Sequence, residues 1–75
     1  MPAPLTLEQA VTRYDMAQST KRHYNHYALA IYLQRADEVM VEVAKGKPLR
    51  DAIIDGFTDR LRAYVLKAMG LEPLP

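Results

Sequence analysis

TKRHYNHYALAIYLQRADEVMVEVAK, residues 20–45, contains no glycine or proline, and it predicts one long amphipathic helix. It lies at the centre of the sequence, so the segments before and after it must pack on it. Its main apolar stripe falls within about 120° on a helical wheel, as a core-facing helix requires. The stripe consists of Ala28, Leu29, Tyr32, Leu33, Ala36, Val39, Met40 and Val43.

A second apolar line on the same predicted helix carries Tyr24, Tyr27 and Ile31, at spacings i, i+3 and i+7. It is rotated by more than about 90° from the centre of the main stripe. Two arrangements fit this line. Either a neighbouring helix covers it inside one chain, or it forms an exposed aromatic patch of the kind that marks interfaces.

The segment before residue 20 opens with a helix start signal. Thr6 can cap the first turn, and Gln9 can complete a capping box. Apolar residues then recur at helical spacing and predict a helix over residues 7–18. Ser19 and Thr20 are good capping residues, which favours a turn before the long helix. The alternative is a single bent helix of about forty residues, because no glycine or proline interrupts the junction.

The segment after residue 45 predicts a third helix. Gly46 is a natural stop for the long helix, and the proline two residues later suits the first turn of a new one. An apolar stripe then continues in phase through Gly56, which predicts one helix over residues 48–69. Gly70 ends this helix, and Leu71 can fold back as the usual apolar contact. The stripe consists of Leu49, Ile53, Ile54, Phe57, Leu61, Tyr64, Val65 and Ala68.

Together these segments predict an all-α fold in a single domain. The expected helices cover about residues 7–18, 20–45 and 48–69 of a domain that spans 1–75, with short extended tails at 1–5 and 71–75. The link after Gly46 is short, so the second and third helices should form an antiparallel hairpin. A domain this small buries only about 60% of its surface. The chain has no cysteine for a disulfide, so we expect dimerisation to complete the bundle.

Composition bounds the class of protein. Apolar residues make up 49% of the chain and charged residues 25%, with a net charge of +1. This balance is typical of a folded globular chain and lacks the strong basic excess of a dedicated nucleic-acid binder. The N-terminus does not have the pattern of a signal peptide, and the longest apolar run, residues 27–33, is too short to span a membrane. We expect a cytoplasmic protein without membrane contact.

The sequence contains no credible catalytic constellation. Ser19 is the only serine, so a nucleophile-based site has almost nothing to work with. His23 and His26 could share one helix face and hold a metal ion, but that turn has no carboxylate for a third ligand. We predict that the protein is not an enzyme, and that it has no cofactor, no metal and no small-molecule substrate.

A basic start of the long helix raises nucleic-acid binding as an alternative. Lys21, Arg22 and His23 lie at the positive end of the helix dipole, interleaved with Tyr24 and Tyr27. Basic side chains beside aromatic rings can hold a phosphate backbone and stack bases. An ordinary solvated helix face explains the same residues.

Residues 48–67 also fit part of a helix-turn-helix template. Ala52 falls in the first helix of that template and Gly56 in the turn. Asp55 and Arg62, however, occupy positions that the template requires to be apolar. The unbroken apolar stripe favours one helix here, whereas a helix-turn-helix needs two.

We therefore predict a small helical interaction module that binds and modulates another macromolecule as a homodimer, with another protein as its expected partner. If the third helix returns beside the start of the second, five apolar residues form the interface. They are Tyr24, Tyr27, Ile31, Leu66 and Met69. The alternative is a small DNA-binding regulator that uses segment 48–67 or the basic residues Lys21, Arg22 and His23.

Overall fold

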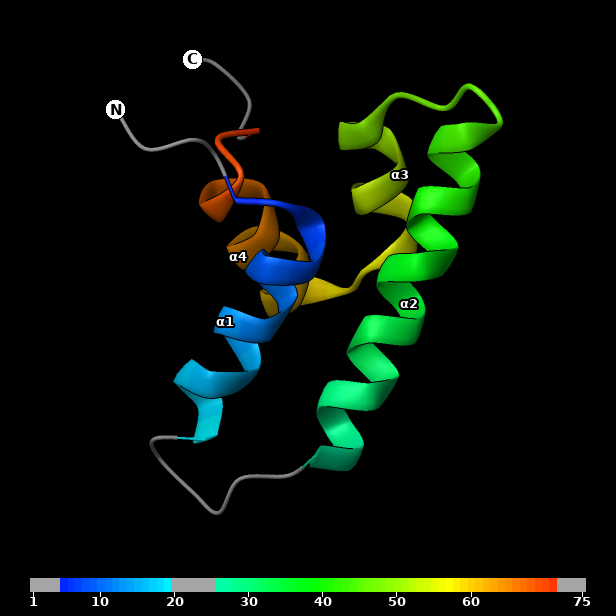
Figure 1. Ribbon diagram of the computed structural model, residues 1–75. Coiled ribbons are helices and arrows are strands. Elements are labelled where there is room, and N and C mark those ends of the chain that lie inside the picture. The colour runs from blue at the N-terminus through cyan, green and yellow to red at the C-terminus, as the bar shows by residue number, and fades with distance from the viewer. Residues whose placement is uncertain (1–4, 20–25, 72–75) are drawn as a thin grey trace.

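The computed structural model in Figure 1 describes residues 5–19 and 26–71. These residues form four α-helices. The helices are α1 (Leu7–Ser19), α2 (His26–Ala44), α3 (Leu49–Gly56) and α4 (Asp59–Ala68). No strand occurs in the described ranges, so the all-α prediction is confirmed. The predicted first six residues of the long helix lie outside these ranges, and so do most of the predicted tails.

The prediction of a single helix over residues 48–69 is wrong, because the chain breaks between α3 and α4. Phe57 has φ −116° and ψ 162°, and Thr58 has φ −115° and ψ 151°, so both residues are extended. An unbroken helix would be about 33 Å long and would carry its second half away from the rest of the chain. The break turns α4 back onto α1, where Leu61 and Val65 become buried.

Two close contacts accompany the break. In a continuous helix the carbonyl of Ile54 would accept the backbone N–H of residue 58. Here the Nη1 of Arg62 donates to that carbonyl at 3.3 Å instead. On the other side of the turn, a Cβ added to Gly56 would lie 2.5 Å from the Cγ2 of Val39, so α3 approaches α2 closely at this residue.

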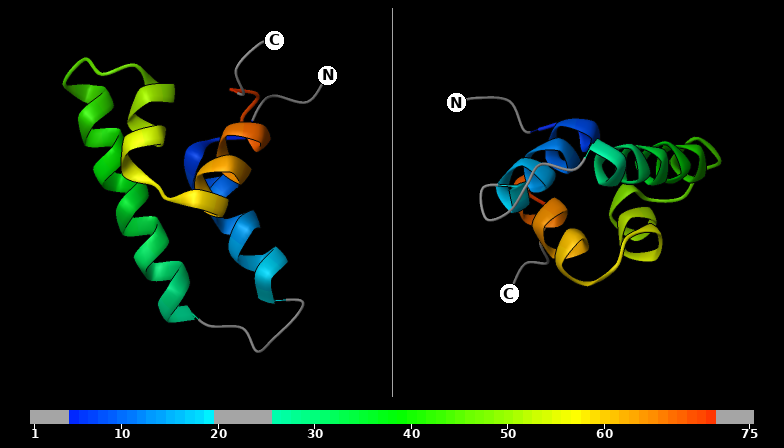
Figure 2. Two further views of the ribbon diagram at one scale, coloured as in Figure 1. Left: turned by 180° about the vertical axis from the view of Figure 1, so that it is seen from behind. Right: turned by 90° about the horizontal axis from the view of Figure 1, so that it is seen from below.

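The helices pack as two pairs, α2 with α3 and α1 with α4, which are joined mainly through α1 and also where α3 meets α4. α3 runs back beside α2 in the opposite direction, which is the predicted hairpin in shortened form (Figures 1 and 2). α4 packs mainly on α1, and α1 also packs on α2. The backbones of α2 and α4, both fully described, do not come close to one another.

All four helices contribute to one hydrophobic core. Tyr14 on α1 connects three of them, because its ring makes edge contacts with Tyr32 on α2 and with Tyr64 on α4. The ring centroids are 5.9 Å and 5.4 Å apart, a favourable separation for aromatic pairs. The buried hydrophobic residues are Leu7, Ala10, Val11, Ala36, Val39, Ala52, Ile53, Phe57, Leu61, Val65 and Leu66.

Local signals at the helix ends are confirmed. Thr6 and Gln9 form a reciprocal capping box, with bonds of 3.2 Å and 3.0 Å. Gly46 and Gly70 both have positive φ and follow the ends of α2 and α4. After Gly70, the N–H of Leu71 donates to the carbonyl of Leu66, and the Leu71 side chain packs against the core as predicted. Among the described helices, none is both long enough and apolar enough to cross a bilayer.

Candidate functional site

Of the five predicted interface residues, Ile31, Leu66 and Met69 have described side chains, and these three do not lie together. Tyr24 lies outside the described residues, and so does the side chain of Tyr27 in α2. Ile31 is half-buried in a hollow of about 350 Å³ between α1, α2 and the first turn of α4. Leu66 is only 8% exposed, and Met69 is half-buried against the core.

The reason is the course of α4. Figures 1 and 2 place the end of α4 beside the start of α1, at the opposite end of the molecule from the start of α2. The predicted juxtaposition of Leu66 and Met69 with the start of the long helix required an unbroken third helix. The candidate nucleic-acid contacts Lys21, Arg22 and His23 lie outside the described residues, as does the side chain of His26.

Among the described residues, three large hydrophobic side chains are exposed, and none of them was predicted as an interface residue. Met16 on α1 is 56% exposed, and Met40 and Val41 on α2 are 45% and 52% exposed. Val41 faces away from the core stripe of α2, so its position on the helical wheel could have identified it as a residue of the outer face. Met40 belongs to the core stripe by its spacing and is exposed despite it.

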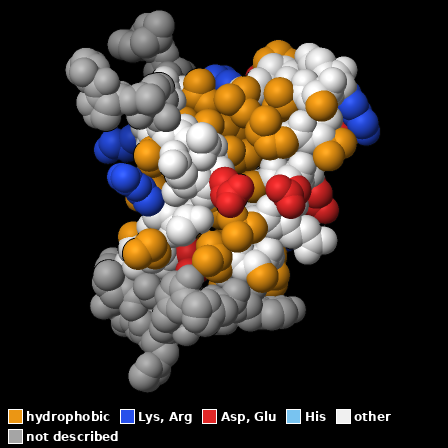
Figure 3. Space-filling view, viewed as in Figure 1, with side chains coloured by type: hydrophobic (Ala, Val, Ile, Leu, Met, Phe, Trp, Pro, Cys, Tyr) orange, Lys and Arg blue, Asp and Glu red, His pale blue; other side chains and the backbone are white. Residues whose placement is uncertain are grey.

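A wider apolar area lies where four helix ends meet. The start of α1, the end of α2, the start of α3 and the end of α4 lie at the same end of the molecule (Figure 1). Each carries half-buried hydrophobic residues that pack on the core and remain partly open to solvent. They are Leu5, Val43, Leu49, Met69 and Leu71. Figure 3 shows a broad hydrophobic area at this end of one face.

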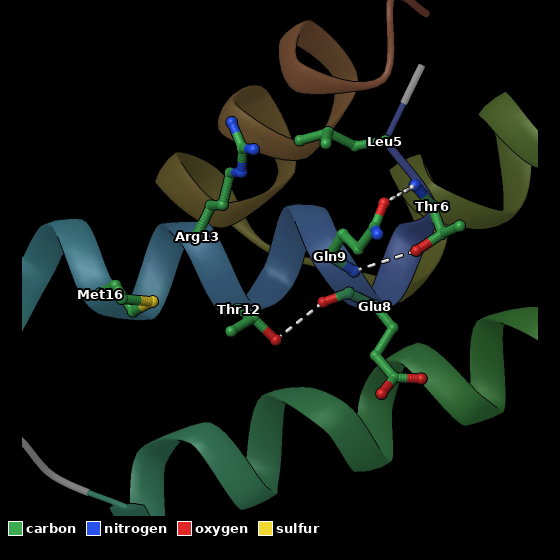
Figure 4. Close-up of a pocket in the computed structure, with 7 residues that line it drawn as sticks. All are labelled: Leu5, Thr6, Glu8, Gln9, Thr12, Arg13 and Met16. Carbon is green, nitrogen blue, oxygen red and sulfur yellow. Dashed lines mark hydrogen bonds between the residues drawn. The ribbon is translucent and has the colours of Figure 1, made fainter. Parts of the chain in front are cut away.

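An open hollow of about 540 Å³ follows the outer face of α1 (Figure 4). Much of its polar lining serves the helix itself. Thr6 and Gln9 cap the first turn, and the hydroxyl of Thr12 donates to the carbonyl of Glu8 at 2.9 Å. Glu8 extends toward α2, whereas Arg13 extends toward α4. Along this hollow, the side of α1 that faces α2 is therefore acidic, and the side that faces α4 is basic.

Charge is distributed unevenly over the surface. Arg60, Ala63 and Lys67 form an exposed stripe on α4, with the exposed carboxylate of Asp59 next to Arg60, and the Arg13 side chain of α1 extends toward α4. Figure 3 shows Lys and Arg side chains grouped along the edge formed by α1 and α4, with Asp and Glu side chains gathered toward α2. Within the described part of the chain, Arg13, Arg60 and Lys67 have no ion pair and no side-chain hydrogen bond.

The observed ion pairs lie on the α2–α3 side. Lys45 contacts Glu42 at 3.4 Å, and Lys47 contacts Asp55. The hydrogen bond from Lys47 to the Asp55 carboxylate raises the pKa of the Lys47 ammonium group. Both pairs are exposed, so they contribute little to stability.

Asp15 is the one buried charged residue among those described. It is 4% exposed, and its Oδ2 has no hydrogen-bond partner among the described residues. The spacing of apolar residues along α1 does not indicate this burial. The described side chains include no group of three that could hold a metal ion.

Comparison with known protein families, with curated proteins and with solved structures finds no match to this chain.

Proposed function

We propose that this protein is a small, non-enzymatic helical interaction module that works as a homodimer and binds another macromolecule. The dimer contact is the outer face of α2, which we define by Asp37, Val41 and Lys45. The observation that carries the proposal is the 52% exposure of Val41 between two charges of opposite sign.

The spacing makes this face complementary to itself. Asp37, Val41 and Lys45 are four residues apart, so they lie along one side of the helix. If two copies of α2 pack antiparallel about Val41, Asp37 of each copy lies opposite Lys45 of the other. A two-fold contact requires this kind of self-complementarity.

The expected affinity is moderate. Burial of Val41 supplies hydrophobic free energy, and the two symmetric charge pairs set the orientation more than the strength of binding. Lys45 can exchange Glu42 for Asp37 of the other copy at little cost, because its ion pair with Glu42 is exposed and joins adjacent turns of the same helix end. A contact of one helix face per copy is small, so we expect dissociation in the micromolar range.

Sedimentation equilibrium over a concentration series that begins below and ends well above the micromolar range tests the dimer. We expect the mass to rise with concentration from the chain mass of 8.5 kDa toward twice that value. Val41→Glu should give the monomer mass, because it places two carboxylates against each other and beside Asp37. Met16→Glu is the matched control, since Met16 is equally exposed on a different helix, and it should leave the dimer intact.

A charge exchange tests the register. Asp37→Lys alone should weaken association, because the new lysine of each copy would lie opposite Lys45 of the other. Asp37→Lys combined with Lys45→Asp should restore association. A wild-type chain that sediments as a monomer throughout the concentration range would overturn the dimer. Dimers that survive Val41→Glu would place the contact elsewhere.

A further inference from the structure

We infer that the edge formed by α1 and α4 binds the phosphate backbone of duplex DNA, with Arg13, Arg60 and Lys67 as the phosphate contacts. This inference takes from the proposed function only that the partner is a macromolecule. It holds for one chain or for two, so the dimer and the DNA contact can fail separately.

The exposed stripe of α4 suits a helix that lies in a groove of DNA. Arg60 and Lys67 are seven residues apart, which places them about 10 Å apart along the helix axis. Ala63 lies between them on the same exposed side, so no bulky side chain prevents close approach of the helix. The major groove is about 12 Å wide and admits one α-helix.

A third cation comes from the neighbouring helix. Arg13 lies on α1, which packs along α4, and its side chain extends toward α4 (Figure 4). The three cations therefore belong to one edge, although they come from distant parts of the sequence. None of them is engaged by another described residue, so all three are available to an anionic ligand.

The rest of the described surface would orient the approach. Five exposed carboxylates belong to α2 and α3, and Glu8 points from α1 toward α2. They are Asp37, Glu38, Glu42, Asp51 and Asp55. Asp59, in the first turn of α4, is an exposed carboxylate next to Arg60, so the positive field that attracts a polyanion extends from Arg60 toward Arg13 and Lys67.

Asp59 lies in the first turn of α4, so it offsets the positive end of the helix dipole beside Arg60. The break between α3 and α4 removes one of the two sequence-based arguments against a helix-turn-helix-like segment, but Asp55 and Arg62 still occupy positions that the template requires to be apolar. In addition, α3 and α4 pack mainly on other helices, so the proposed contact is the α1–α4 edge.

Fluorescence anisotropy with a short labelled duplex of mixed sequence tests the inference. Three phosphate contacts predict a slope of log K against log salt of about −2.7 for each chain, so a fourfold rise in salt weakens binding about 40-fold. Each single substitution, Arg13→Gln, Arg60→Gln or Lys67→Gln, should reduce the slope by about 0.9. Circular dichroism of each variant should match the wild type, because all three side chains are exposed.

Lys47→Gln is the control. Lys47 lies between α2 and α3, where it pairs with Asp55, so its loss should leave the slope unchanged. The monomeric Val41→Glu chain should still bind, with the slope of a single chain. No binding at low salt, or an equal loss in Lys47→Gln, would overturn the inference. Tighter binding to polyglutamate than to the duplex would also overturn it, in favour of an acidic protein partner.

Discussion

Gly56 lies where the last turn of α3 presses against α2. Its Cα hydrogen occupies a space that a methyl group could not, because the added Cβ would come within 2.5 Å of the Cγ2 of Val39. Val39 is itself buried and branched at Cβ, so it has little freedom to move away. The glycine is therefore required for close packing of α2 and α3, and its φ angle is ordinary for a helix.

Gly56→Ala should destabilise the protein, although alanine is the better helix former. The gain in helix propensity is about 1 kcal/mol at most, whereas overpacking a core contact costs about 1–3 kcal/mol. We expect a net loss of about 1 kcal/mol in the free energy of unfolding by urea titration. In a double-mutant cycle, Val39→Ala should relieve this cost. A more stable Gly56→Ala chain would show that α2 and α3 are less closely packed than described.

The break between α3 and α4 could not be predicted from the sequence. Ile53, Phe57, Leu61 and Val65 recur every four residues. They would therefore face a core both in one straight helix and in two helices joined by an extended link. Periodicity cannot separate these cases. Signals that act within a turn, such as the Thr6–Gln9 capping box and the glycines after α2 and α4, predicted the helix ends correctly.

The incorrect prediction of one helix over residues 48–69 also affected the candidate sites. Leu66 was predicted to lie in an exposed patch because α4 was taken as a continuation of α3, and the turn back onto α1 buries it. The grouping of Arg13 with Arg60 and Lys67 also depends on that turn, so no local pattern in the sequence indicates it. Val41 could have been identified, because its position on the helical wheel depends on α2 alone.

Arg62→Met should weaken the junction between α3 and α4. Arg62 donates to the carbonyl of Ile54, whose helical partner is lost at the break. Removing a charged donor from a half-buried carbonyl should cost about 1 kcal/mol of unfolding free energy, measured by thermal or urea denaturation. Arg60→Met, the exposed neighbour in the same helix, is the control and should change stability by less than about 0.5 kcal/mol. Equal effects would mean that the hydrogen bond is not what supports the turn.

The whole molecule depends on α1. α2 and α4 do not pack on each other, and α3 packs on α4 less extensively than α1 packs on α2 and on α4, so α1 is the main connection between the two halves. Tyr14 is part of this connection, because its ring contacts Tyr32 on α2 and Tyr64 on α4. A chain built in this way should unfold as one cooperative unit.

Val11→Asp tests this role of α1. Val11 is fully buried, and an unpaired carboxylate at that position should cost more than about 4 kcal/mol, which approaches the entire stability of a domain of this size. Because α1 joins the two halves, the loss should spread to all four helices. The helical signal in far-UV circular dichroism should therefore be low and should show no cooperative thermal transition. The thermal transition in tyrosine fluorescence should be lost as well. Met16→Asp places the same charge on the exposed side of the same helix and should melt like the wild type. If the Val11→Asp chain kept a cooperative transition with about half the helical signal, the α2–α3 pair would be stable by itself, and α1 would not be the element that holds the fold together.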